Sequence, residues 1–138
     1  MPHITCAAHA ATGAARCALQ QRTQPPQPML NPAAEVTIAR ELALAEQARQ
    51  AGNEGRARVC ARRAAGWAVA AGAGAAALPN AFVQLQRLAK DSAQPAHIRS
   101  AAAHLTLRIT SEHQLPGNAD PLSEARSIIR HFLPQVPA

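Results

Sequence analysis

Three residues on one predicted helix could take part in acid–base chemistry. His97, His104 and Arg108 fall within about 40° of one another on a helical wheel. Histidine can act as a general base near neutral pH, and arginine can stabilise a charged transition state. Seven-residue spacing separates the two histidines by about 10 Å along the helix axis, too far to share a metal ion or relay a proton within one chain. We therefore interpret both histidines as structural residues beside the core.

The first part of the chain contains candidate metal ligands at His3, Cys6, His9 and Cys17. Structural zinc sites usually take two ligands from each of two short segments, and the last of these cysteines has no near partner. We therefore predict no metal site and no cofactor. Because Gln and Pro dominate residues 20–28, we expect a disordered tail and linker over residues 1–31 and one helical domain over residues 32–138.

Four arginines form a candidate nucleic-acid-binding stripe on one side of a predicted helix: Arg56, Arg58, Arg62 and Arg63. Guanidinium groups suit phosphate oxygens, and the formal net charge of +6 favours an acidic partner such as RNA or a nucleotide. The alternative is a solvated helix face whose charges pair with neighbouring acids, and the residue types alone favour that alternative. A GC-rich genome, which prefers alanine and arginine codons, would produce the same composition.

The elements that must position these residues are helices. Hydrophobic residues make up 48% of the chain, but alanine supplies much of this fraction and aromatic residues only 2%. A core of alanine and leucine needs backbones that approach closely, which helices with small-residue faces allow. Few segments alternate with period two or cluster β-branched residues, so strands are not expected. We predict an all-α, antiparallel four- to five-helix bundle.

The first two helices are predicted to form an antiparallel hairpin. Asn31 and Pro32 start the first, Gly52 ends it, and Asn53 caps the second from Glu54. One side of the second helix is an alanine seam with Trp67 beside it: Ala57, Cys60, Ala61, Ala64, Ala68 and Ala71. A three-four rhythm in the first helix predicts its inward residues: Val36, Ala39, Leu42, Ala43 and Glu46.

Proline and turn residues delimit three further helices. The third is expected from Pro79 to about Lys90, and the fourth from Pro95 to residues 111–113. Asp120 and Pro121 open the fifth. The predicted inward residues of these helices are Phe82, Leu85, Leu88 and Ala89; Ile98, Ala102, Leu105 and Ile109; and Leu122, Ala125, Ile128, Ile129 and Phe132.

The hairpin places a glycine between two helices and small residues along the second, at Gly52, Ala57, Ala61, Ala64 and Ala65. In this pattern it resembles the HEPN superfamily of small helical-bundle domains, and the resemblance covers about residues 35–133. Ribonucleases of that superfamily carry an R-x4-6-H motif near a late helix. Arg108 and His113 have this spacing and order, so the resemblance implies that they are the catalytic pair. The same spacing also occurs at Arg99–His104 and Arg126–His131.

The resemblance implies a homodimer whose late helices meet and bring the two copies of Arg108 and His113 together. Ile109 follows the motif arginine, where the family commonly has a polar residue, and Leu115 replaces a common tyrosine. We therefore predict a non-catalytic dimeric module that binds an acidic, nucleotide or nucleic-acid partner. One alternative is a metal-independent endoribonuclease with His113 as general base and Arg108 stabilising the charged transition state. The other is a scaffold that binds a protein partner through its helix faces.

The cellular location is predicted from cysteine usage and hydropathy. The three cysteines, Cys6, Cys17 and Cys60, form no disulfide framework, so we expect a reducing cytoplasm. No stretch approaches the roughly 18 apolar residues of a membrane span, so no membrane partner is expected.

Overall fold

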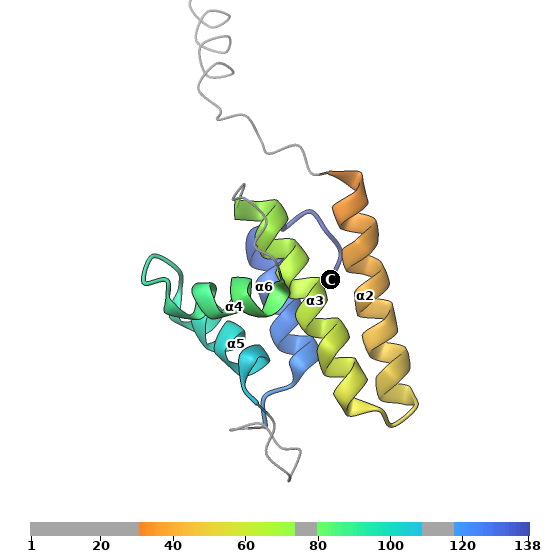
Figure 1. Ribbon diagram of the computed structural model, residues 1–138. Coiled ribbons are helices and arrows are strands. Elements are labelled where there is room, and N and C mark those ends of the chain that lie inside the picture. Colours follow the sequence, from red (N-terminus) through yellow and green to blue (C-terminus); the bar gives the residue numbers. More distant parts are fainter. Residues whose placement is uncertain (1–30, 74–79, 109–117) are drawn as a thin grey trace, which may run out of the picture.

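A computed structural model describes residues 31–73, 80–108 and 118–138. These residues form helices and contain no strand, which confirms the all-α prediction. Figure 1 shows the bundle. Its helices are α2 (Pro32–Gln50), α3 (Glu54–Ala73), α4 (Ala81–Lys90), α5 (Ala96–Thr106) and α6 (Pro121–Phe132). The predicted disorder of the tail concerns residues that, apart from Asn31, lie outside this description.

Local capping chemistry starts the α2–α3 hairpin as predicted. The Asn31 side chain accepts a hydrogen bond from the Ala33 amide at 3.1 Å, and Pro32 occupies the first helical position. Gly52 turns the chain with φ +74°, a conformation that glycine adopts without steric cost. Asn53 Oδ1 then accepts from the Arg56 amide at 3.0 Å and caps α3. The two helices lie side by side (Figure 1).

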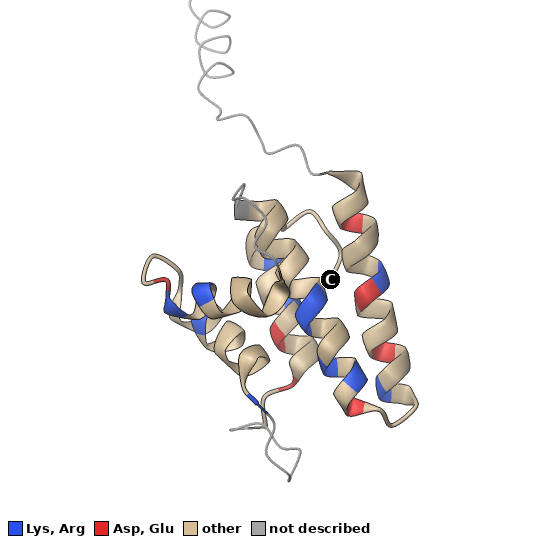
Figure 2. Cartoon of the chain, in the orientation of Figure 1, with Lys and Arg blue, Asp and Glu red and all other residues tan. Residues whose placement is uncertain are grey.

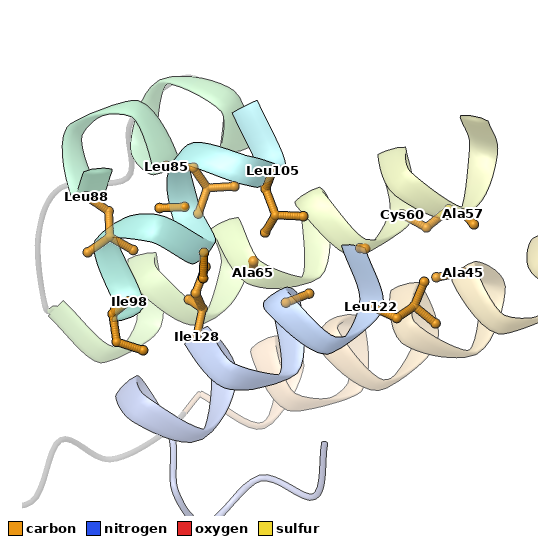
Figure 3. Packing of buried hydrophobic residues seen from close by; sticks show 14 of the residues in the cluster. Ala45, Ala57, Cys60, Ala65, Leu85, Leu88, Ile98, Leu105, Leu122 and Ile128 are labelled. Carbon is orange, nitrogen blue, oxygen red and sulfur yellow. The ribbon is translucent and has the colours of Figure 1, made fainter. Parts of the chain in front are cut away.

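Helix α3 is the central helix of the bundle, because it contacts each of the other four helices (Figure 1). Its alanine seam is buried as predicted, except that Ala71 is half-buried. A core cluster joins residues of all five helices, including Ala45, Ala65, Leu85, Leu105 and Leu122 (Figure 3). The bundle therefore packs small side chains of α3 against leucines and isoleucines from the helices around it.

Two glycines allow neighbouring helices to approach α3 closely. A Cβ atom added to Gly66 would overlap Ala81 and lie 2.8 Å from its Cα atom. One added to Gly72 would lie 2.7 Å from Phe132 Cβ and 2.9 Å from its carbonyl oxygen. No side chain fits at either contact without movement, so glycine sets the spacing of α3 to α4 and of α3 to α6.

The buried face of α2 differs from the prediction. Its buried residues are Ala34, Ile38, Leu42, Ala45 and Ala48. Only Leu42 was predicted, whereas Val36 is 68% exposed. Apolar residues surround most of this helix, so more than one three-four rhythm fits the sequence. The observed rhythm buries Ile38 and leaves Glu46 exposed, where it forms an ion pair with Arg126 of α6.

The later helices begin close to their predicted positions, but α5 is shorter than predicted. Asn80 caps α4, and its Oδ1 accepts from the Val83 amide at 2.8 Å. Helix α5 ends at Thr106, and Leu107 adopts an extended conformation with ψ 137°. Arg108 therefore lies beyond the helix rather than on a common helical face with His97 and His104. Residues 109–117, which include Ile109, lie outside the description.

Candidate functional site

The exposed surface of α3 is a narrow strip that combines two arginines with two apolar side chains. Arg56, Val59, Arg63 and Trp67 succeed one another at spacings of three, four and four residues, so they share one face of the helix. All four are exposed, and Trp67 exposes 48% of its surface. We call these four residues the outer strip. Figure 2 shows the arginine positions of α3 beside the basic and acidic positions of α2.

Trp67 was expected beside the buried alanine seam. On the helical wheel it lies about 20° from Arg56, between the seam and the exposed arginines. That position was the only signal in the sequence for its exposure. A large aromatic side chain at the surface of α3 can contact a partner with much apolar area and few rotatable bonds.

The outer-strip arginines form no ion pair with any acid in the described parts of the chain. The nearest candidate along α3, Glu54, instead lies 3.4 Å from Arg49 Nε. The Cys60 thiol lies close enough to both arginines for them to favour its thiolate, although burial and Glu41 raise its pKa overall. Arg56 and Arg63 therefore present guanidinium groups to solvent beside Trp67.

The other two arginines of the predicted stripe point elsewhere. Arg58 is only 4% exposed, so its expected place on an exposed stripe is wrong. Arg62 is half-buried: its Nε donates to the Leu105 carbonyl oxygen at 2.9 Å, and its guanidinium lies 5.6 Å from the Phe82 ring centroid. The physical reason is that α3 is central. Four helices pack around it, and the side that carries Arg62 meets Leu105 of α5 and Phe82 of α4.

The predicted catalytic pair cannot be assembled from the described residues. Arg108 is exposed just beyond α5, and His113 lies outside the description. In the two other R-x4-H pairs, both of which are described, the arginine and the histidine form no hydrogen bond with each other. His104 Nδ1 lies 2.9 Å from Glu124 Oε1 of α6. Arg126 pairs with Glu46, while His131 Nε2 lies 3.0 Å from Gln94 Oε1.

A dimer through the late helices would need exposed apolar surface on α6, and α6 carries no large exposed hydrophobic residue. The large exposed hydrophobic residues of the described chain are Val36, Val59, Trp67 and Leu107, and none belongs to α6. Helix α3 carries two of the four. Apolar contact with a partner would therefore involve α3 more readily than α6.

The described ranges contain neither a candidate metal-binding cluster nor a candidate membrane span. No group of three His, Cys, Asp or Glu side chains there could hold a metal ion, and the candidate ligands of the tail lie outside these ranges. None of the described helices is long and apolar enough to cross a membrane.

Comparisons with protein-family models, curated proteins and solved structures find no match to this chain.

Proposed function

We propose that this chain is a HEPN-like, non-catalytic module that binds single-stranded RNA on the outer strip of α3. The observation that carries the proposal is Trp67, exposed one helical turn from Arg63 with no acid paired to the arginine. Aromatic side chains stack on unpaired bases, and arginines neutralise the phosphates of the same strand. Arg56 extends the positive charge along the helix by about 10 Å from Arg63.

The choice of a single strand rests on the shape of the strip. A duplex offers its phosphates but keeps its bases stacked inside, so it would not use Trp67. An acidic peptide would use the arginines without needing a flat aromatic face. The arrangement of two cationic side chains followed by one aromatic residue along an exposed helix face therefore fits a flexible strand with unstacked bases.

We also propose that the chain forms a homodimer, which a measurement of its mass in solution tests separately. Light scattering at high concentration should give twice the mass of the chain, and a strict monomer would contradict the dimer without affecting RNA binding. The ribonuclease alternative stays a prediction, because His113 lies outside the residues that the structure describes.

Trp67 gives a direct readout of binding. It is the only tryptophan, and the chain contains no tyrosine. Titration with a single-stranded RNA homopolymer should quench its fluorescence, and raising the salt concentration should reverse the quenching. A matched duplex should quench it little. Binding of both RNAs without quenching would contradict stacking on Trp67.

Paired charge variants test whether the outer strip makes the phosphate contacts. In Arg56→Ala/Arg63→Ala, affinity should fall, and the slope of log K against log salt should decrease by about 1.4, or about 0.7 per lost contact. Arg87→Ala/Lys90→Ala removes the same charge from exposed positions of α4 and serves as the control. Equal losses in the two double variants would show that only net charge matters and would contradict this interface.

A second pair of variants tests the aromatic contact, measured by anisotropy of labelled RNA. Trp67→Ala should weaken binding by about 5- to 150-fold, corresponding to 1–3 kcal/mol per stacked base. Trp67→Phe should restore part of this affinity, because it keeps an aromatic face. If both variants bind as the parent does, Trp67 takes no part in binding.

A further inference from the structure

The most unusual charged group in the described chain is the buried guanidinium of Arg58. The residue is 96% buried, and its Nε and Nη2 atoms have no hydrogen-bond partner. A buried charge is normally paired or bound to an ion, because burial removes the water that stabilises it. An arginine cannot relieve this cost by losing its proton at ordinary pH.

A second arginine lies beside it and increases the cost. Arg62 is one helical turn further along α3, on the same side of the helix. The pKa of Arg58 is lowered, first by burial and then by the positive charge of Arg62. Burial also lowers the pKa of Arg62. The pair therefore concentrates two positive charges in a partly buried place.

The acids of the described chain do not compensate this pair. Those that form ion pairs contact Arg49, His104 and Arg126 instead. The buried Glu41 Oε2 has no hydrogen-bond partner either, but Glu41 acts on the Cys60 thiol, on the α2 side of α3. The Leu105 carbonyl oxygen satisfies only Nε of Arg62.

We propose that Arg58 and Arg62 form a binding site for a phosphate group between α3 and the C-terminal end of α5. A phosphate carries up to two negative charges at neutral pH and offers several acceptor oxygens, so one group can neutralise both arginines. Gly55 lies one turn before Arg58 on the exposed surface, where an added Cβ atom would meet only Asn53 Oδ1, at 3.8 Å. The start of α3 is therefore exposed one helical turn before Arg58.

The site is independent of the outer strip. Arg58 is buried and Arg62 contacts α5, whereas Arg56 and Arg63 are exposed. RNA binding by the outer strip could fail while the phosphate site remains, and the reverse also holds. The ligand is defined by its phosphate group, which could be inorganic phosphate or the terminal phosphate of a nucleotide.

Thermal unfolding with millimolar inorganic phosphate tests the site. The ionic strength is held constant with chloride, and the parent's Tm should rise by at least about 5 °C when phosphate greatly exceeds its Kd. Arg58→Met replaces the charge with an apolar side chain of similar length. It should be more stable than the parent in chloride and show no phosphate-dependent rise in Tm. The difference in Tm between Arg58→Met and the parent should therefore become smaller, or change sign, when phosphate is added.

Arg87→Met is the control for general effects of phosphate on protein stability. This arginine is exposed on α4 and belongs to neither proposed site, so its substitution should leave the phosphate-dependent shift unchanged. Equal shifts in the parent and Arg58→Met would overturn the proposal. If Arg58→Met does not fold, calorimetric titration of the parent with inorganic phosphate decides, and the absence of both heat and a Tm shift overturns it.

A nucleoside 5′-monophosphate distinguishes the two sources of the phosphate group. If the nucleotide binds the parent more tightly than inorganic phosphate does, and Arg58→Met binds neither ligand, the site takes the terminal phosphate of a nucleotide. If only inorganic phosphate binds, the site takes the free anion. Binding of the nucleotide that is unchanged in Arg58→Met, with no binding of inorganic phosphate, would contradict the site.

Discussion

Gly66 and Gly55 lie on the same helix but have different surroundings. Gly66 is buried against Ala81 of α4, whereas Gly55 is exposed near the start of α3. Gly66→Ala should destabilise the protein by about 1–3 kcal/mol, because the methyl group overlaps backbone and Cβ atoms that cannot move independently. The free energy of unfolding measured in urea checks this value.

Gly55→Ala is the matched control. An alanine at this exposed helical position meets no close neighbour, and it restricts the unfolded chain more than glycine does. We expect stability to stay the same or rise by up to about 1 kcal/mol. A loss of stability similar to that of Gly66→Ala would show that the cost at Gly66 does not come from its close contact with Ala81.

At the scale of elements, Asp120 links the start of α6 to the end of α2. Its Oδ2 accepts from the Ser123 amide at 3.2 Å and caps α6, while Oδ1 accepts a hydrogen bond from Arg49. The Arg49 hydrogen bond is the main cause that holds the pKa of Asp120 below its ordinary value of 3.8. The same contact raises the pKa of Arg49.

This lowered pKa predicts a specific acid dependence. The folded state holds the Asp120 proton less tightly than the unfolded state, so its contribution to stability is complete above about pH 4 and is lost as pH falls through the lower folded-state pKa. Asp120→Asn keeps a capping oxygen but removes the charge. It should cost no more than about 1 kcal/mol at pH 7, because solvent reaches the pair, and it should flatten the stability profile below pH 4.

Denaturant unfolding at several pH values checks this prediction. Arg49→Gln should flatten the acid profile in the same way, because the pair requires both partners. If the free energy of unfolding of Asp120→Asn depends on pH as the parent's does down to pH 2, Asp120 has the same pKa in the folded and unfolded states, which contradicts the prediction.

At the scale of the whole molecule, one core cluster joins all five helices, so damage in α5 should affect the entire bundle. Leu105 is completely buried in this cluster, whereas Leu107, two residues later, is 39% exposed. Leu105→Ala should lower the free energy of unfolding by about 2–5 kcal/mol. Leu107→Ala should change it by less than about 0.5 kcal/mol. Circular dichroism should show one transition in each variant, and loss of α5 alone would contradict a common core.

The starts of the helices could be predicted because their causes are local. Asn31, Asn53 and Asp120 accept hydrogen bonds from amides two or three residues later, so the capping side chain and its partner lie in the same short segment. Gly52 likewise turns the chain through its own backbone freedom. The composition also predicted the alanine seam, since small side chains repeated along one face allow close helix packing.

The inward face of α2 and the end of α5 could not be predicted in the same way. Several apolar rhythms fit α2, and only contact with its neighbours selects the one that buries Ile38. The candidate site had a similar ambiguity. A helical wheel with one buried side places all four predicted arginines outside, and it gives no sign that other helices surround α3.

The amino-acid sequence by itself determined that this chain is helical, where its helices begin, and that α3 packs through alanine, because these properties follow from local hydrogen bonding and side-chain size. Only the tertiary structure decided which charges of α3 meet solvent. Four helices pack around α3, so Arg58 is buried, Arg62 binds a carbonyl oxygen of α5, and Arg56, Val59, Arg63 and Trp67 remain exposed.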